Sequence, residues 1–244
     1  MKNLLIVPVI ILSCTVYSQE MKVHKTNGTV ESFLISDIEK ITFSITGDDG
    51  NTFTDPRDGH VYKIKSIGSQ TWMTENLAYL PSVSPSSDDS YSLPFYYVYG
   101  YEGTSVSDAK ATDNYQTYGV LYNSPAANVA CPTGWHLGDD AEWKQLIAYL
   151  GGEDIAGQKM KSVTGWPSGS EGDNSSGFSA LPSAGRLEDG NFSGLGSWAY
   201  FWVYWKNSEN SVNWARYWTL KNTAEAIWRE ATRHSGWAVR CLKD

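Results

Sequence analysis

The chain has 244 residues, a formal net charge of −8 and an unusually large number of bulky aromatic residues, with eleven Trp and fifteen Tyr. An acidic surface repels phosphate groups, so this charge disfavours nucleic acid and anionic lipid as partners. No run of about 20 apolar residues occurs, and the sequence therefore predicts no membrane-spanning segment.

Residues 1–18 are typical of an export signal. Lys2 supplies a short positive region, residues 4–12 are almost wholly apolar, and small residues precede a cleavage position before Gln19. In the alternative interpretation, a lipoprotein-like box ends at Cys14, whose lipidation would anchor the protein to a membrane surface. Both interpretations predict an extracytoplasmic protein, either secreted or associated with the cell surface or outer membrane.

Both interpretations also remove Cys14 from the fold and leave Cys131 and Cys241 as the cysteines of the mature chain. Disulfides persist in an oxidising compartment, so this pair predicts one bridge; two buried free thiols are the alternative. Loss of residues 1–18 removes one lysine and no acid, which makes the formal net charge −9.

Residues 19–46 are predicted to form a small β-rich unit. Alternating segments at 21–26 and 29–34 flank an Asn27-Gly28 turn, which is a strong hairpin signal. Residues 47–52 are polar and rich in Gly and Asp, as in a linker. The main domain is then expected to span residues 53–244.

Within that domain, residues 60–67 and 70–77 predict a second hairpin, and residues 82–113 predict a long surface loop. Asp139 and Glu142 form a capping-box pattern that predicts a helix ending at Gly151-Gly152. A second, shorter helix is predicted over 153–161. Beyond residue 165, Gly/Ser loops alternate with predicted strands at 178–181, 199–205, 215–220 and 237–242.

Aromatic residues of this last region are the candidate ligand-binding groups, because flat rings stack on sugars while nearby guanidinium groups supply directed hydrogen bonds. Those expected in loops have the best chance of contacting a ligand. Alternation along 199–205 predicts that one face of this strand is core. The candidate ligand-binding residues are Trp198, Trp214, Arg216, Trp228 and Arg233.

Catalytic and metal-binding patterns are weak, and we expect no enzyme activity and no obligatory cofactor. The four histidines are scattered, and Glu142 is explained as a helix cap. Calcium is the one ion with candidate ligands, Asp108 and Asp113, although acidic loop residues are more often simply solvated.

Several segments together resemble the Fibrobacter succinogenes major paralogous domain, a family of exported proteins of Bacteroidetes and Fibrobacteres. They include Gly134-Trp135-His136-Leu137 and the closing Val239-Arg240-Cys241, and they occupy residues 54–62, 70–77, 118–123, 131–143, 177–186 and 239–241. The pattern is also similar, more weakly, to C-type-lectin-like and sulfatase-modifying-factor-like domains.

This resemblance implies an α+β, C-type-lectin-like domain with short twisted antiparallel strands, one or two helices and long loops. It also implies that Cys131 and Cys241 join the start of the helical part to the last strand. The expected function is non-catalytic binding of carbohydrate or a surface polymer. The alternative is a cell-surface adhesin or assembly module that binds a protein partner.

Overall fold

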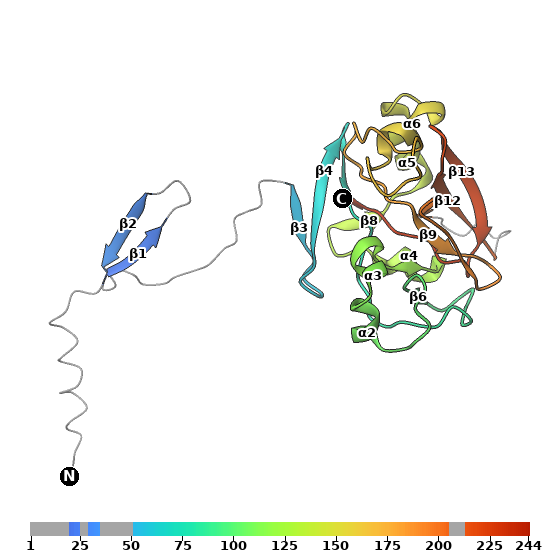
Figure 1. Cartoon of the computed structure of the whole chain (residues 1–244), viewed down its shortest axis with the longest axis horizontal. Coiled ribbons are helices and arrows are strands. Elements are labelled where there is room, and N and C mark those ends of the chain that lie inside the picture. Colours follow the sequence, from blue (N-terminus) through green and yellow to red (C-terminus); the bar gives the residue numbers. More distant parts are fainter. Residues whose placement is uncertain (1–19, 25–28, 35–50, 205–212) are drawn as a thin grey trace, which may run out of the picture. The chain divides into compact units, whose positions relative to one another are not determined.

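A computed structural model describes residues 20–24, 29–34, 51–204 and 213–244 (Figure 1). The chain divides into two compact units, residues 1–47 and 48–244. In the first unit, β1 (Glu20–His24) pairs antiparallel with β2 (Val30–Leu34), as the hairpin pattern predicts. The export signal with Cys14, the hairpin turn and most of the expected linker lie outside the described residues.

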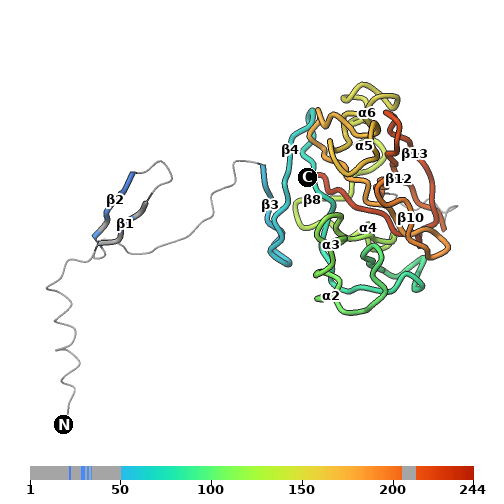
Figure 2. The backbone as a smooth tube through the Cα atoms, in the orientation of Figure 1, coloured from blue at the N-terminus to red at the C-terminus, as the bar shows by residue number. Residues whose placement is uncertain are grey.

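The second unit contains two five-stranded sheets. The first sheet is antiparallel and has the order β3-β4-β5-β14-β8, so the last strand of the chain is inserted between β5 and β8. The C-terminus accordingly lies beside β8 (Figure 2). Its strands are β3 (Thr52–Thr54), β4 (Val61–Ile67), β5 (Gln70–Met73), β8 (Trp135–Leu137) and β14 (Cys241–Lys243). The hairpin predicted over 60–77 is therefore confirmed as β4 and β5.

The second sheet has the order β10-β9-β11-β12-β13 and is antiparallel except for the β9–β11 pair. Its strands are β9 (Ser183–Arg186), β10 (Phe192–Leu195), β11 (Ala199–Val203), β12 (Trp214–Leu220) and β13 (Ala226–Thr232). A strand predicted at 178–181 is absent, because that segment makes only an isolated bridge at Ala180. A two-stranded sheet of β6 (Tyr96–Tyr97) and β7 (Leu121–Tyr122) completes the unit.

The described residues contain five helices, rather than the one or two expected, and three of these are short. The helices are α2 (Val106–Lys110), α3 (Asp113–Tyr118), α4 (Ser124–Ala130), α5 (Asp140–Tyr149) and α6 (Glu153–Met160). Helix α2 lies within residues 82–113, which were predicted as a surface loop, and α3 begins at the last residue of that segment. In α5 both hydrogen bonds of the predicted capping box are present. None of the helices in the described part of the chain is long and apolar enough to cross a membrane.

The core consists of two clusters that meet at β11. Trp202 packs with Trp237 in one cluster, and Phe201 packs with Trp143 in the other. The predicted core face is confirmed by Phe201 and Val203, and Trp202 on the opposite face is buried as well, because a central strand between two clusters is covered on both faces.

A disulfide links Cys131, which directly follows α4, to Cys241, the first residue of β14; their Cα atoms are 5.8 Å apart. The bridge expected from the cysteine pair is present. It ties the helical part of an α+β fold to the last strand of the first sheet.

Candidate functional site

The structure does not gather the five predicted binding residues at one place. Trp214, Arg216 and Trp228 lie on the face of the second sheet that packs toward α5, because Trp228 is directly opposite the buried Trp218 in the β12–β13 register. Two of them were expected in loops, but Trp214 begins β12 and Trp228 lies within β13. The strand β13 was missed because its alternation is broken by consecutive charged residues.

Trp198 and Arg233 lie elsewhere. The Trp198 indole is parallel to the Tyr200 ring, with centroids 5.9 Å apart, and Tyr200 packs against the other core cluster. Arg233 follows β13, and its backbone carbonyl accepts a hydrogen bond from the Ser124 amide at the start of α4.

Asp140, the first residue of α5, is the centre of a polar cluster that holds two of the predicted residues, Arg216 and Trp228. Its Oδ2 lies 2.7 Å from Lys144 Nζ and 3.4 Å from Arg216 Nη1. Its Oδ1 accepts a hydrogen bond from Trp228 Nε1 at 3.2 Å. The Arg216 guanidinium also lies 4.9 Å from the centre of the Trp228 ring, a distance typical of a cation–π contact. Arg216 and Trp228 therefore hold α5 against β12 and β13.

Beside this cluster is a pocket of about 360 Å³, which we call the Tyr204 pocket. Tyr204 follows β11, and its amide donates a hydrogen bond to the Gly138 carbonyl at 2.9 Å. Its side chain is 41% exposed, whereas the Trp135 side of the pocket is nearly buried. The lining residues are Asn128, Val129, Cys131, Trp135, His136, Leu137, Asp139, Glu142 and Tyr204. Since Asp139 and Asp140 are consecutive, the pocket and the Asp140 cluster adjoin each other.

His136 and Glu142 form a polar wall of the Tyr204 pocket, and Asp244, which is not a lining residue, contacts the other ring nitrogen of His136. His136 Nδ1 lies 2.7 Å from Asp244 Oδ1, and its Nε2 lies 2.9 Å from Glu142 Oε1. Burial disfavours the charged imidazole, but the hydrogen bonds to Asp244 and Glu142 outweigh it and raise the pKa of His136. Glu142 also accepts the Asp139 amide at 2.8 Å, as its role in the helix cap requires. The carboxylate and the ring are thus held in fixed positions.

The calcium candidates are separated from this pocket in sequence and element. Asp108 lies in the first turn of α2 and Asp113 in the first turn of α3, and both are exposed. Carboxylates at these positions interact favourably with a helix N-terminus. Nowhere in residues 51–204 or 213–244 do three or more His, Cys, Asp or Glu side chains come together in a metal-ligating group.

Sequence reasoning missed Tyr204 and Asp140 as site residues. The pairing of Asp140 with Lys144 is visible as an i,i+4 spacing, but its contacts to β12 and β13 span 76 and 88 residues. Tyr204 belongs to the predicted strand at 199–205, and nothing in that segment indicates that its ring borders a pocket.

The fold is an α+β domain with one disulfide, and its candidate site is a pocket lined by aromatic and polar residues at the start of α5. The model of the Fibrobacter succinogenes major domain family matches residues 66–243, and the chain belongs to this family. No curated protein and no solved structure matches the chain.

Proposed function

We propose that this chain is an exported, non-catalytic binding domain with a C-type-lectin-like fold, which takes carbohydrate at the Tyr204 pocket. The observation that supports this proposal is the combination of an exposed phenol ring and a fixed polar wall in one depression. Tyr204 supplies the ring, and His136 with Glu142 supplies the wall.

The Tyr204 ring and the polar wall of the pocket suit the apolar face and the hydroxyl groups of a sugar. The apolar face of a sugar ring packs on an aromatic ring, while its hydroxyl groups require directed donors and acceptors. Carboxylates of Asp139 and Glu142 accept such hydrogen bonds, and the Asn128 amide both donates and accepts them. The volume of about 360 Å³ falls within the range of small-molecule sites.

The predicted residues on the α5 side of the sheet extend this site. Trp214 is 50% exposed and lies on the same face of β12 as Arg216, whose partner Asp140 follows the pocket residue Asp139. A sugar polymer longer than the pocket would therefore meet a second exposed ring. Trp198 and Arg233 have no part in this proposal.

The test is a glycan array followed by calorimetry on residues 19–244, with and without calcium. We expect selective glycan binding that falls about fivefold in Tyr204→Ala, since an aromatic contact contributes roughly 1 kcal/mol. Tyr149→Ala is the matched control, because Tyr149 is an exposed tyrosine at the other end of α5, about 14 Å along the helix axis. Equal glycan affinity in the wild type and both variants would contradict the proposed site.

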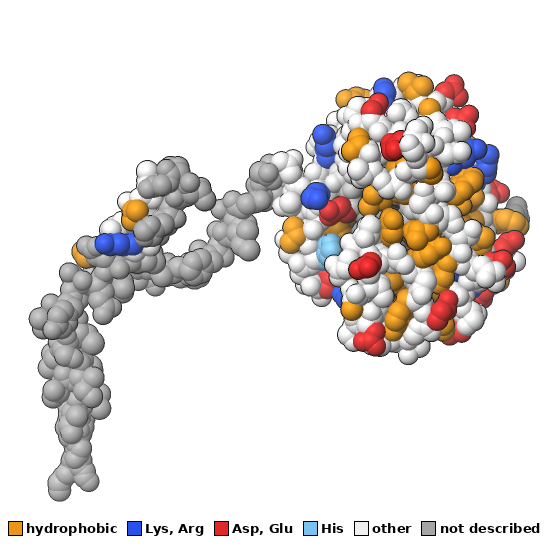
Figure 3. Space-filling view, in the orientation of Figure 1, with side chains coloured by type: hydrophobic (Ala, Val, Ile, Leu, Met, Phe, Trp, Pro, Cys, Tyr) orange, Lys and Arg blue, Asp and Glu red, His pale blue; other side chains and the backbone are white. Residues whose placement is uncertain are grey.

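A protein partner is the second candidate, and it is favoured by a separate observation. Hydrophobic side chains form a band across the face on which β9 and β10 are drawn (Figure 3). Leu195, at the end of β10, and Trp198 are both more than a third exposed. If the array shows no glycan, a surface protein whose affinity falls in Trp198→Ala and not in Tyr204→Ala would establish this function.

A further inference from the structure

A second pocket, of about 490 Å³, shares no lining residue with the Tyr204 pocket. It lies between the end of α3 and the hairpin of β4 and β5, and Ser162 and Ser179 come from the loops beside it. Arg240, the residue before β14, contributes to its wall. We call it the Arg240 pocket.

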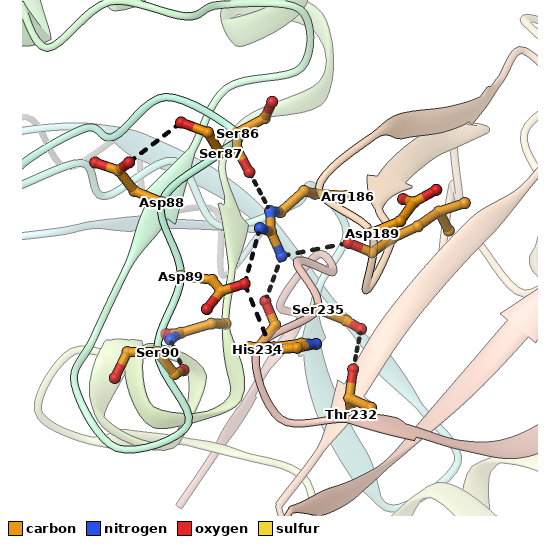
Figure 4. A network of polar contacts seen from close by, with 12 residues as sticks. Ser86, Ser87, Asp88, Asp89, Ser90, Arg186, Asp189, Thr232, His234 and Ser235 are labelled. Atoms are coloured by element: carbon orange, nitrogen blue, oxygen red, sulfur yellow. Dashed lines mark hydrogen bonds and ion pairs between the residues drawn. The ribbon is translucent and has the colours of Figure 1, made fainter.

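Arg240 is a buried cation without an anionic partner. Only 1% of the residue is exposed, and no carboxylate oxygen of the described residues lies within 4.0 Å of its guanidinium nitrogens. Arg186 is buried to the same extent, but its Nη2 lies 3.3 Å from Asp89 Oδ2. Figure 4 shows this ion pair. Among the described residues, one buried guanidinium is therefore paired with a carboxylate and the other is not.

Neutral oxygens hold the Arg240 guanidinium in place. Its Nε donates to Asn76 Oδ1 at 2.8 Å, its Nη1 donates to the carbonyls of Met73 and Phe178 at 3.3 and 2.7 Å, and its Nη2 donates to the Ser179 carbonyl at 3.2 Å. A guanidinium has five N–H donors, so these four bonds leave one hydrogen on Nη2 for another acceptor. The group is rigid before any ligand arrives.

Neutral acceptors satisfy four of the five donors but do not balance the charge. Burial disfavours the charged form and lowers the pKa of Arg240 to about 9, while the more distant Glu75 acts in the opposite direction. An uncompensated buried charge is costly, and an anion placed next to it recovers part of that cost.

The other charges at the pocket do not provide this anion. Glu75 Oε1 lies 3.2 Å from Lys63 Nζ, so the one carboxylate of the lining is already paired. The formal charge of the lining is therefore positive on a chain whose net charge is −8. Hydroxyl and amide groups make up much of the remaining wall, including those of Gln116, Thr117 and Ser162.

We propose that the Arg240 pocket binds a small hydroxy-carboxylate of the sugar-acid class, with the carboxylate against the Nη2 side of Arg240. A charge-assisted hydrogen bond to a guanidinium is stronger than a neutral one, which selects the carboxylate. The hydroxyl groups of a hexuronic acid match the hydroxyl and amide groups of Gln116, Thr117 and Ser162. A neutral sugar leaves the Arg240 charge unbalanced and binds more weakly.

The test compares galacturonate with galactose by calorimetry on residues 19–244, and follows the Arg240 Nε–H resonance by NMR during the titration. We expect galacturonate alone to bind, with a dissociation constant of about 1 mM or lower, and to shift that resonance. Equal binding of galactose, or no galacturonate binding at about 10 mM, would overturn the proposal.

Two surface variants test the electrostatic argument without disturbing the buried arginine. Glu75→Gln removes a negative charge from the wall and should tighten galacturonate binding about fivefold, whereas Lys63→Glu should weaken it about fivefold. Unchanged affinity in both variants would refute a charge-selected site. Tyr204→Ala should leave galacturonate binding intact, which separates this site from the Tyr204 pocket.

Discussion

Reduction of the Cys131–Cys241 disulfide should lower the free energy of unfolding by about 4 to 5 kcal/mol. The two cysteines are 110 residues apart, and the chain-entropy model assigns about that much to a loop of this length. Domains of this kind typically have a total of about 5 to 15 kcal/mol, so the bridge would supply a large part of the stability. The loss is large because most of the second unit lies inside the closed loop.

Guanidinium chloride unfolding of the oxidised and reduced protein measures this difference. The slope of the transition should also increase on reduction, because an unfolded chain without the bridge exposes more surface. The Cys131→Ala/Cys241→Ala double variant is the control, since reduced wild type keeps both sulfur atoms and the variant does not. Oxidised and reduced proteins within about 1 kcal/mol of each other would refute the loop-entropy reasoning.

Three further perturbations address single contacts. Gly157→Ala should destabilise the fold by about 1 to 3 kcal/mol in urea unfolding, because its Cβ would lie 2.3 Å from the Glu225 carbonyl oxygen and this overpacking exceeds the helix-propensity gain; a more stable variant would contradict it. The raised pKa of His136 means that its stabilisation is fully present below the unfolded-state pKa and is lost as pH rises through the folded-state pKa. The stability difference between wild type and His136→Gln should therefore shrink between about pH 5 and 8, and a constant difference would exclude this linkage. Trp228→Phe keeps an aromatic ring, although a smaller one, and removes the hydrogen bond to Asp140, so thermal or urea unfolding should show a loss of at least about 1 kcal/mol; an unchanged stability would mean that the bond contributes nothing.

Features encoded by neighbouring residues could be predicted from the sequence. The start of α5 depends on Asp139 and Glu142, three residues apart, and both hydrogen bonds of that cap are present. The β4–β5 hairpin depends on alternation around a short turn, and the disulfide was expected because loss of the predicted signal segment would leave only Cys131 and Cys241.

The short helices show where local reasoning failed. Thr112 and Asn123 cap α3 and α4 with side-chain hydrogen bonds, but helices of six and seven residues are too short to show a clear apolar period. Neither segment was therefore predicted as a helix. A capping residue that is not followed by a helical pattern of apolar residues is weak evidence for a helix.

The arrangement of the candidate binding residues depends on sheet register, which could not be derived from the local sequence pattern. Trp228 reaches Asp140 only because β13 pairs with β12 in a register that places Trp228 opposite Trp218. A shift of one residue would turn Trp228 to the other face of the sheet. The Tyr204 pocket likewise exists because Tyr204 bonds to Gly138, 66 positions earlier in the chain.

Two consecutive residues connect the core to the Tyr204 pocket. Asp139 caps α5 and borders the pocket, while Asp140 holds the same helix against Arg216 and Trp228 of the second sheet. The start of α5 is thus fixed from both sides, and the acceptors that face the pocket do not need to be ordered when a ligand binds. Because ordering costs reduce affinity, a site built on such fixed elements binds more tightly than the same groups on a free loop.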